Sequence, residues 1–304
     1  MIRHAVLVSG MLACVAAAAQ PPALRVCMNE DVPPFSVAKG DSGTGFDVAL
    51  ATAIAQQLAR PLAIQWFESK IDEEASPTLE ANALLSDQRC QLVAGYPLTE
   101  QSLGRPASKT ARLPDFHGAG PADRRRRVQL GEIIASRPYQ RAPLALVLAP
   151  GVGMRVIRGL ADVTDLRLGA EGGTFADAIL MLYGKGQLIE RITHYPPGRG
   201  IVLAKLEAGE IDATFVALHR FDAYRLQNPA TRIRHSGYNY PVAFNLGYAA
   251  RAENAALVQE VNKALDALRR SGEIEALAKA AGVTYVAPAE PYVSPPITFR
   301  QLEN

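Results

Sequence analysis

The chain has 304 residues, of which 48% are hydrophobic and 20% are charged. At about 100–200 residues per domain, this length allows two domains or one large one. The 24 glycines and 21 prolines follow no period, which excludes a collagen-like chain. A net charge of +2 gives no reason to expect nucleic acid or an anionic membrane as the partner.

The first 19 residues have the pattern of a secretory signal peptide. Arg3 precedes an apolar run at residues 5–18, and Ala17 and Ala19 supply an A-x-A cleavage pattern. The run is shorter than the roughly 20 residues that a membrane-spanning helix needs. We therefore expect export to the periplasm and no membrane span in the mature chain. Lipidation at Cys14 is a minor alternative.

Two cysteines remain in the mature chain, Cys27 and Cys90. Both lie at apolar segments that read as buried strands. Disulfides persist in an oxidising compartment, and neighbouring strands bring cysteines within bridging distance. We predict a disulfide, with two reduced core thiols as the alternative. Neither cysteine has a second Cys or His at ligand spacing, so no metal site is predicted.

Strand and helix patterns alternate along the rest of the chain. Alternation of this kind predicts largely parallel sheets covered by helices. The first block has strands at residues 24–28, 62–67 and 92–94 and helices at 48–58 and 79–85. A proline-rich excursion at residues 104–143 separates it from the second block.

The second block starts with a strand at residues 144–148. Further strands are predicted at 165–170, 191–194 and 211–216, with helices at 174–183 and 199–208. A strand at 242–249 then returns to the first block, followed by helices at 255–271 and 274–281. In the first of these helices apolar residues recur every three or four positions. The proline-rich tail from residue 287 is expected to be extended and peripheral.

Seven short motifs occur in a fixed order along residues 24–283. They are PPF at 33–35, GFDVAL at 45–50, CQLVAG at 90–95, PY at 138–139, EGGT at 171–174, LEAGEIDA at 206–213, and NKAL at 262–265 leading to SGEI at 271–274. Together they resemble the family-3 extracellular solute-binding proteins, the periplasmic components of polar amino-acid ABC importers.

The resemblance implies two α/β lobes joined by two crossing strands, with ligand held in the cleft between them. The fold expected is therefore periplasmic binding protein-like, with a mostly parallel sheet in each lobe. Lobe 1 is predicted at residues 20–143 plus 243–287, lobe 2 at 144–242, and an extended tail at 288–304. The implied partners are a small-molecule ligand and an inner-membrane ABC permease, without nucleic acid.

The clearest candidate site is the turn Gly172-Gly173-Thr174. Such a turn before a helix leaves backbone N–H groups free to bind an anion, and the resemblance implies a ligand carboxylate. Thr174 as a simple helix cap is the alternative. Phe35 is a candidate for packing on the ligand, or else a core residue. Glu30 and Asp31 follow the first strand, where open α/β sheets bind ligands, although solvent exposure accounts for them equally well.

Two positions depart from the amino-acid-binding pattern. The arginine of the family's T-x-x-R motif, which starts here at Thr99, is replaced by Ser102. Ala217 stands where an aspartate receives the α-ammonium. Arg105 is the nearest arginine, and we include Thr99 and Arg105 among the candidate ligand-binding residues. The substitutes that stay open are Arg105, Arg112, His219 and Arg220. A standard α-amino acid is therefore a doubtful ligand.

Two other functions are compatible with the same resemblance. A cysteine in both the first and third strands also resembles the accessory proteins of periplasmic quinoprotein (PQQ) alcohol dehydrogenases. Their partner is the dehydrogenase. Some proteins of this fold are dehydratases of the cyclohexadienyl type, which need a cleft carboxylate as general acid. We expect a binding protein, with no catalytic residue, no metal and no cofactor, because no catalytic or dinucleotide motif is present.

Overall fold

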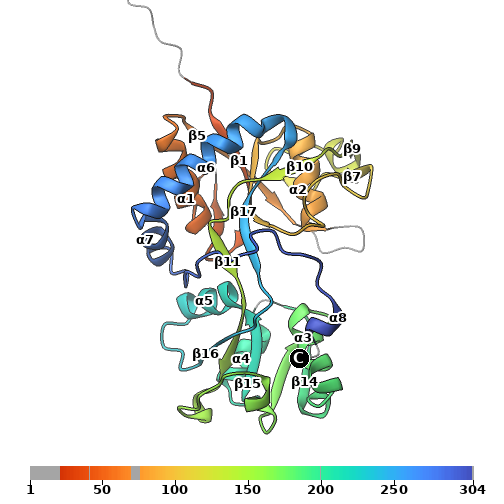
Figure 1. Cartoon of the computed structure of the whole chain (residues 1–304), viewed down its shortest axis with the longest axis vertical. Coiled ribbons are helices and arrows are strands. Elements are labelled where there is room, and N and C mark those ends of the chain that lie inside the picture. The colour runs from red at the N-terminus through yellow and green to blue at the C-terminus, as the bar shows by residue number, and fades with distance from the viewer. Residues whose placement is uncertain (1–20, 41, 70–75, 199, 303–304) are drawn as a thin grey trace, which may run out of the picture.

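The computed structural model describes residues 21–40, 42–69, 76–198 and 200–302. They form two lobes, one above the other in Figure 1. The predicted signal peptide at residues 1–19, with Cys14, lies outside the described residues. Among the helices that are described, none is both long enough and apolar enough to span a membrane.

The upper lobe, lobe 1, contains a seven-stranded sheet. Its order is β10-β17-β6-β1-β5-β8, and β11 pairs with another part of β17. β1 is parallel to both β5 and β6, whereas β17 runs antiparallel to β6. The strands are β1 (Leu24–Asn29), β5 (Leu62–Glu68), β6 (Leu92–Pro97), β8 (Asp115–Phe116), β10 (Ile133–Ala135), β11 (Gln140–Ala142) and β17 (Phe244–Arg251).

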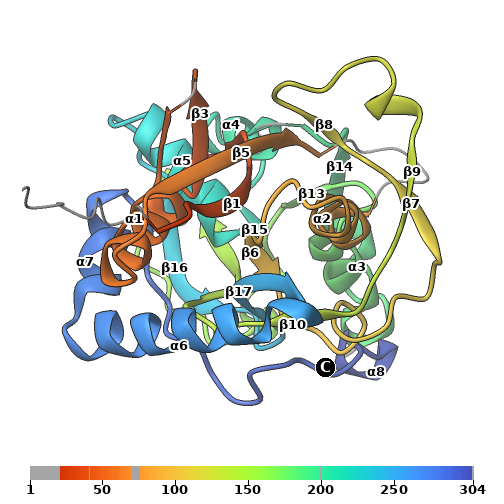
Figure 2. The ribbon, with the colours of Figure 1, turned by 90° about the horizontal axis from the view of Figure 1, so that it is seen from above.

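Helices cover both faces of this sheet (Figure 2). They are α1 (Phe46–Gln57), α2 (Pro77–Ser86), α6 (Ala255–Arg270) and α7 (Glu273–Ala280). Leu24, Val26 and Met28 of β1 pack with α1, α6 and α7, and Cys27 packs on the other side with α2. A strand buried on both faces needs apolar residues at consecutive positions, which explains the apolar run Val26-Cys27-Met28.

The lower lobe, lobe 2, contains a five-stranded sheet in the order β14-β13-β15-β12-β16. β13 is parallel to β14 and β15, and β12 is antiparallel to β15 and β16. The elements are β12 (Leu144–Leu148), β13 (Leu168–Glu171), β14 (Ile192–Tyr195), β15 (Ala213–Ala217), β16 (Arg234–Asn239), α3 (Phe175–Leu182), α4 (Ile201–Glu207) and α5 (Leu218–Gln227).

Two crossings join the lobes, from β11 to β12 and from β16 to β17. The predicted two-lobe α/β fold is confirmed, and antiparallel strands accompany the parallel ones in each sheet. Sequence patterns did not predict α5, β16 or the short strands. Of these strands, β2 (Asp31–Val32), β3 (Ser36–Lys39) and β4 (Ser42–Thr44) form one small sheet, and β7 (Thr110–Arg112) and β9 (Arg127–Gln129) form another. The others, β8, β10 and β11, belong to the sheet of lobe 1.

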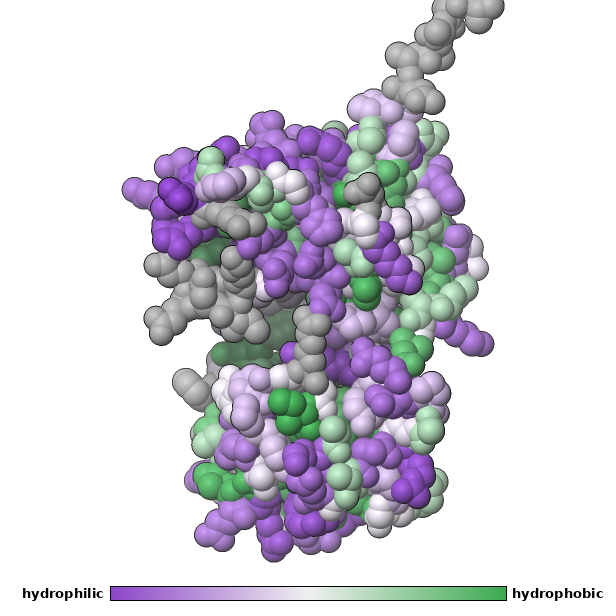
Figure 3. Space-filling model, turned by 180° about the vertical axis from the view of Figure 1, so that it is seen from behind, coloured by the Kyte–Doolittle hydropathy of each residue, from purple (hydrophilic) through white to green (hydrophobic). Residues whose placement is uncertain are grey.

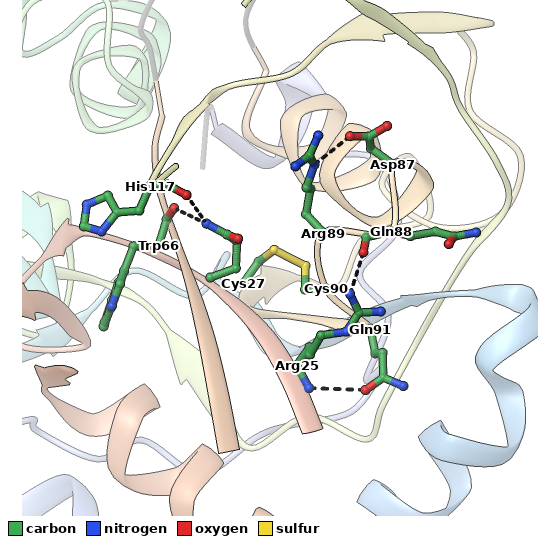
Figure 4. Close-up of a disulfide and its surroundings, with 10 residues drawn as sticks. Arg25, Cys27, Trp66, Asp87, Gln88, Arg89, Cys90, Gln91 and His117 are labelled. Carbon is green, nitrogen blue, oxygen red and sulfur yellow. Dashed lines mark hydrogen bonds and ion pairs between the residues drawn. A yellow bond between two sulfur atoms is a disulfide. The ribbon is translucent and has the colours of Figure 1, made fainter. Parts of the chain in front are cut away.

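A disulfide joins Cys27 of β1 to Cys90, just before β6 (Figure 4). Both cysteines are buried, and they lie 63 positions apart in the sequence. Figure 4 also shows two hydrogen bonds beside the bridge, from Arg25 to Gln91 Oε1 and to the Gln88 carbonyl. The predicted bridge is therefore confirmed, and it links two adjacent parallel strands of lobe 1.

Most of the C-terminal tail lies outside regular secondary structure and is exposed, and it contacts both lobes. On lobe 1, the Asn245 amide donates to the Ala289 carbonyl at 2.8 Å, and the Ser294 N–H donates to the Leu98 carbonyl at 2.9 Å. The tail then ends in a short helix, α8 (Phe299–Leu302), next to α3 of lobe 2 (Figure 1). Leu302 is 7% exposed there and belongs to the lobe 2 core. The tail is thus a third connection between the lobes.

Candidate ligand-binding cleft between the lobes

Two adjoining cavities lie where the lobes meet. The larger, which we call the cleft cavity, has a volume of about 560 Å³, and the smaller, the lobe 1 cavity, about 320 Å³. Val32 and His219 line both. Figure 3 shows the hollow between the lobes, with hydrophobic residues at its base. Cavities of this size are typical of small-molecule sites.

The cleft cavity takes one wall from each lobe. Lobe 1 contributes the turn Asp31-Val32-Pro33, and lobe 2 contributes Glu171 and the facing surfaces of α4 and α5. The lobe 2 residues are Glu171, Gly200, Val202, Leu203, Ala204, Val216, His219, Arg220, Ala223, Tyr224, Gln227 and Asn228. Because both lobes line this cavity, a change in their separation alters its shape.

The lobe 1 cavity is mainly apolar and aromatic. Phe35, one of the predicted ligand-binding residues, lies in its lining and is only 6% exposed. Gly45 makes this position possible, because a Cβ on Gly45 would come within 2.3 Å of the Phe35 carbonyl oxygen. The Phe35 turn can therefore rest directly against the start of α1, where the Asp47 N–H donates to the Phe35 carbonyl. Phe35 is both a core residue and a cavity residue.

A buried carboxyl group also lines the lobe 1 cavity. Asp47 Oδ1 accepts a hydrogen bond of 2.8 Å from the Tyr139 hydroxyl, which itself accepts one from the Gly95 N–H. Burial raises the pKa of Asp47 to about 7, although the Tyr139 hydrogen bond acts in the opposite direction. Asp47 therefore titrates near neutral pH, and Tyr139 links it to Gly95 in β6.

His219 separates the two cavities. It follows Leu218 at the start of α5, and its ring centroid lies 5.1 Å from that of Phe35 in the opposite lobe. Burial, with the neighbouring charge of Arg220, lowers the pKa of His219 to about 4. At neutral pH the side chain is therefore an uncharged imidazole packed against Phe35.

The predicted donors at Gly172-Gly173-Thr174 all have partners within lobe 2. The Gly172 N–H donates to the Tyr195 carbonyl at 2.9 Å, and the Thr174 N–H donates to the Glu171 carbonyl at 3.3 Å. The Gly173 N–H donates to Asp177 Oδ2 at 2.9 Å. The Thr174 hydroxyl accepts from the Asp177 N–H, so Thr174 is the N-cap of α3. Asp177 occupies the place that the sequence analysis gave to a ligand carboxylate.

The other predicted site residues are scattered around the cleft. Asp31 lines the cleft cavity, whereas Glu30 pairs with His117, their Oε2 and Nε2 atoms 2.8 Å apart. Thr99 bridges to Ser294 of the tail. Arg105 is exposed and lines neither cavity. The candidate residues brought together at the cavities are therefore Phe35 and Asp31.

The two departures from the amino-acid clamp have clear structural roles. The Ser102 hydroxyl donates to the Pro97 and Thr99 carbonyls, so it closes a turn. Ala217 ends β15, and α5 begins at the next residue. Of the four possible substitutes for the missing charges, His219 and Arg220 line the cavities, and Arg105 and Arg112 do not.

Asp222 holds α5 in place beside the cavities. Its two carboxylate oxygens accept hydrogen bonds of 2.7 Å from the N–H and the hydroxyl of Thr284, after α7. Sequence analysis missed this helix because no Gly, Pro or Ser separates it from β15. Among the described residues, no group of three or more His, Cys, Asp or Glu side chains is arranged to hold a metal ion.

Comparison with known proteins identifies the fold only. No protein-family model and no curated protein sequence matches the chain. Substrate-binding domain 2 of GlnP from Lactococcus lactis, in an open conformation, is similar with a TM-score of 0.62 and 16% identity, covering 87% of this chain and 97% of that one. The unliganded, open L-cystine solute receptor of Neisseria gonorrhoeae has a TM-score of 0.60 and 18% identity, covering 88% and 95%.

A third similar structure is a histidine kinase sensor domain described as resembling periplasmic binding proteins. Its TM-score is 0.54 at 18% identity, and the alignment covers 88% of this chain and 98% of that one. The chain therefore has the periplasmic binding protein fold, as the sequence motifs predict.

Proposed function

We propose that the protein is an exported solute-binding protein that captures a small polar or anionic molecule between its lobes and delivers it to an ABC importer. The observation that carries this proposal is the pair of adjoining cavities, lined from both lobes and divided by His219 against Phe35. Hinge closure is a common response of two-lobed proteins to a ligand held between the lobes.

The comparisons support this proposal through the fold. The similar structures named above include a substrate-binding domain and a solute receptor, both open. In our proposal the ligand is bound and released unchanged, so no residue acts as a catalyst. No observation favours the dehydratase or the quinoprotein-associated alternative.

The proposal includes export and a division of the chain. Residues 1–19 direct the protein to the periplasm, residues 20–143 and 243–287 form lobe 1, and residues 144–242 form lobe 2. The strands of the five-stranded sheet all fall between Leu144 and Asn239, which supports this division. An inner-membrane permease is the proposed partner.

A ligand screen combined with a measurement of shape tests the proposal. A ligand that binds only the folded form raises its stability, so thermal-shift screening of carboxylates, amino acids, amines and sugars should yield a positive class. Small-angle scattering should then show a smaller radius of gyration with that ligand. If no compound in a broad library raises the melting temperature, solute binding is contradicted.

A further inference from the structure

A charged pair marks the lobe 2 wall of the cleft cavity. Arg220 Nη1 donates to Glu171 Oε2 at 2.8 Å, and both residues line the cavity. The Glu171 side chain is 7% exposed, whereas that of Arg220 is 50% exposed. The buried carboxylate therefore fixes one side of a guanidinium that is otherwise open to the cavity.

The guanidinium has donors left for a ligand. Arginine carries five N–H donors in a planar fork, which matches a carboxylate bidentately. Within the described residues, Glu171 is the partner recorded for Arg220. A ligand carboxylate can therefore bind the remaining N–H groups while the pair with Glu171 persists.

Two of the three carboxylates that line the cavities, Glu171 and Asp47, already have partners within the chain. Glu171 is paired with Arg220, and Asp47 accepts the Tyr139 hydroxyl. Asp31, the third carboxylate of the lining, lies on the lobe 1 wall of the cleft cavity. Ala217 provides no charge where the related family places an aspartate. The described lining thus offers Arg220 to an anion, whereas the carboxylates of Glu171 and Asp47 already accept donors from within the chain. Burying an ammonium group without a partner is costly.

The lobe 1 cavity provides an apolar space next to this anion site. Its lining includes Met28, Phe35, Phe67, Tyr96 and Leu246. His219, which precedes Arg220 in α5, lines both cavities. An apolar protein cavity of about 150 Å³ accommodates benzene. The lobe 1 cavity, at about 320 Å³, is large enough for a substituted ring or a branched chain.

We propose that the ligand is a small monocarboxylate with an uncharged, apolar body and no ammonium group. Its carboxylate binds Arg220, and its body enters the lobe 1 cavity past Phe35 and His219. This inference rests on the proposed solute-binding function and specifies the class of solute.

Four matched probes separate the groups that matter. 3-Phenylpropionate has the carboxylate and the ring, 3-phenyl-1-propanol lacks the carboxylate, L-phenylalanine adds the ammonium, and hexanoate replaces the ring with a chain. Titration calorimetry should show binding of the two plain carboxylates. Affinity for the alcohol and for phenylalanine should each be at least about tenfold lower, because each leaves one charged group without its partner.

Arg220→Gln tests the residue directly. Its affinity for 3-phenylpropionate should fall by about 10- to 100-fold, the usual effect of losing a charge-assisted hydrogen bond. Its weak binding of the alcohol should not change. Arg225→Gln is the matched control, because Arg225 lies on the same helix, over the Phe221 ring, and lines neither cavity. A melting curve for each variant establishes that it is folded.

The outcomes distinguish this inference from the function on which it rests. If phenylalanine binds more tightly than 3-phenylpropionate, or if Arg220→Gln binds as well as the parent protein, the ligand class is wrong. If only amines or sugars raise the melting temperature, solute binding stands and the carboxylate class fails. If no small molecule in a broad library binds, the proposed function and this inference both fail.

Discussion

The two lobes have related βα architectures but are held together by different means. Lobe 1 contains the Cys27–Cys90 disulfide and the buried carboxyl of Asp47. Residues 144–242 contain no cysteine, and lobe 2 instead incorporates α8 from the end of the chain. The apolar cavity thus lies in a covalently fixed lobe. The charged wall, with Arg220, lies on a lobe whose packing depends on the tail.

Removing the disulfide should cause the largest loss of stability, and the loss should be confined to lobe 1. The double variant Cys27→Ser/Cys90→Ser opens a loop that spans 63 positions. The resulting gain in entropy of the unfolded chain should lower the free energy of unfolding by about 4 kcal/mol. Urea denaturation should show a loss of this size. Hydrogen exchange should accelerate in β1, β5 and β6, while β12 and β15 keep their protection. If hydrogen exchange accelerated equally in both sheets, the disulfide would stabilise both lobes and not lobe 1 alone.

Asp47→Asn should alter the pH dependence of stability. The folded-state pKa of Asp47, about 7, lies above the ordinary value of 3.8, so the folded protein retains a proton that the unfolded chain has lost. The proton on Asp47 therefore contributes about 4 kcal/mol to the free energy of unfolding. This contribution is complete below pH 3.8 and is lost as the pH rises through 7. The asparagine still offers an oxygen to the Tyr139 hydroxyl.

Urea titrations at several pH values between 4 and 8 measure this effect. The parent protein should lose stability over this range by more than Asp47→Asn does. Tyr139→Phe provides the contrast, because the Tyr139 hydrogen bond lowers the pKa of Asp47 and its loss should raise that pKa further. Identical profiles for the parent protein and Asp47→Asn would exclude Asp47 as the titrating group.

Shortening the tail should weaken lobe 2 more than lobe 1. A chain ending at Ala287 lacks Leu302, whose burial stabilises lobe 2 by about 1.5–3 kcal/mol. It also lacks the Gln301 carbonyl, which accepts a hydrogen bond of 2.9 Å from the Tyr240 hydroxyl. Protection from hydrogen exchange should fall in α3. Leu302→Ala should reproduce most of this loss of protection. If protection were unchanged in both variants, the tail would not stabilise lobe 2.

The sequence predicted the fold more fully than the site. Most of the longer elements from β1 to α7 follow apolar patterns that the sequence displays, and motif order indicated two lobes. α5 was missed because it follows β15 directly and because the buried Asp222 interrupts its apolar face. Asp222 accepts its hydrogen bonds from Thr284, 62 positions away, and no local pattern reveals such a partner. His219 and Arg220 were therefore named as substitutes without a helix to place them.

The turn at Gly172-Gly173-Thr174 is a second case in which the local sequence did not reveal the partners of a group. Its residue types and its position before a helix suit an anion site, and if a ligand carboxylate binds there, Thr174→Ala should weaken carboxylate binding. Asp177, four positions after Gly173, supplies the anion from within the chain. A pattern of donors identifies a potential site, and in this structure the backbone donors of the turn already have partners within lobe 2.

Thr174→Ala should have the smallest effect and decides between these two accounts. Loss of an N-cap hydroxyl costs about 1 kcal/mol of helix stability, because the Asp177 N–H loses its acceptor. Urea denaturation should show this loss, and Thr174→Ser, which keeps the hydroxyl, should not. Affinity for 3-phenylpropionate should be unchanged in both variants if Arg220 binds the carboxylate. A tenfold weaker affinity with unchanged stability would instead assign the carboxylate to the turn, and lobe 2 would then bind its ligand at the end of β13.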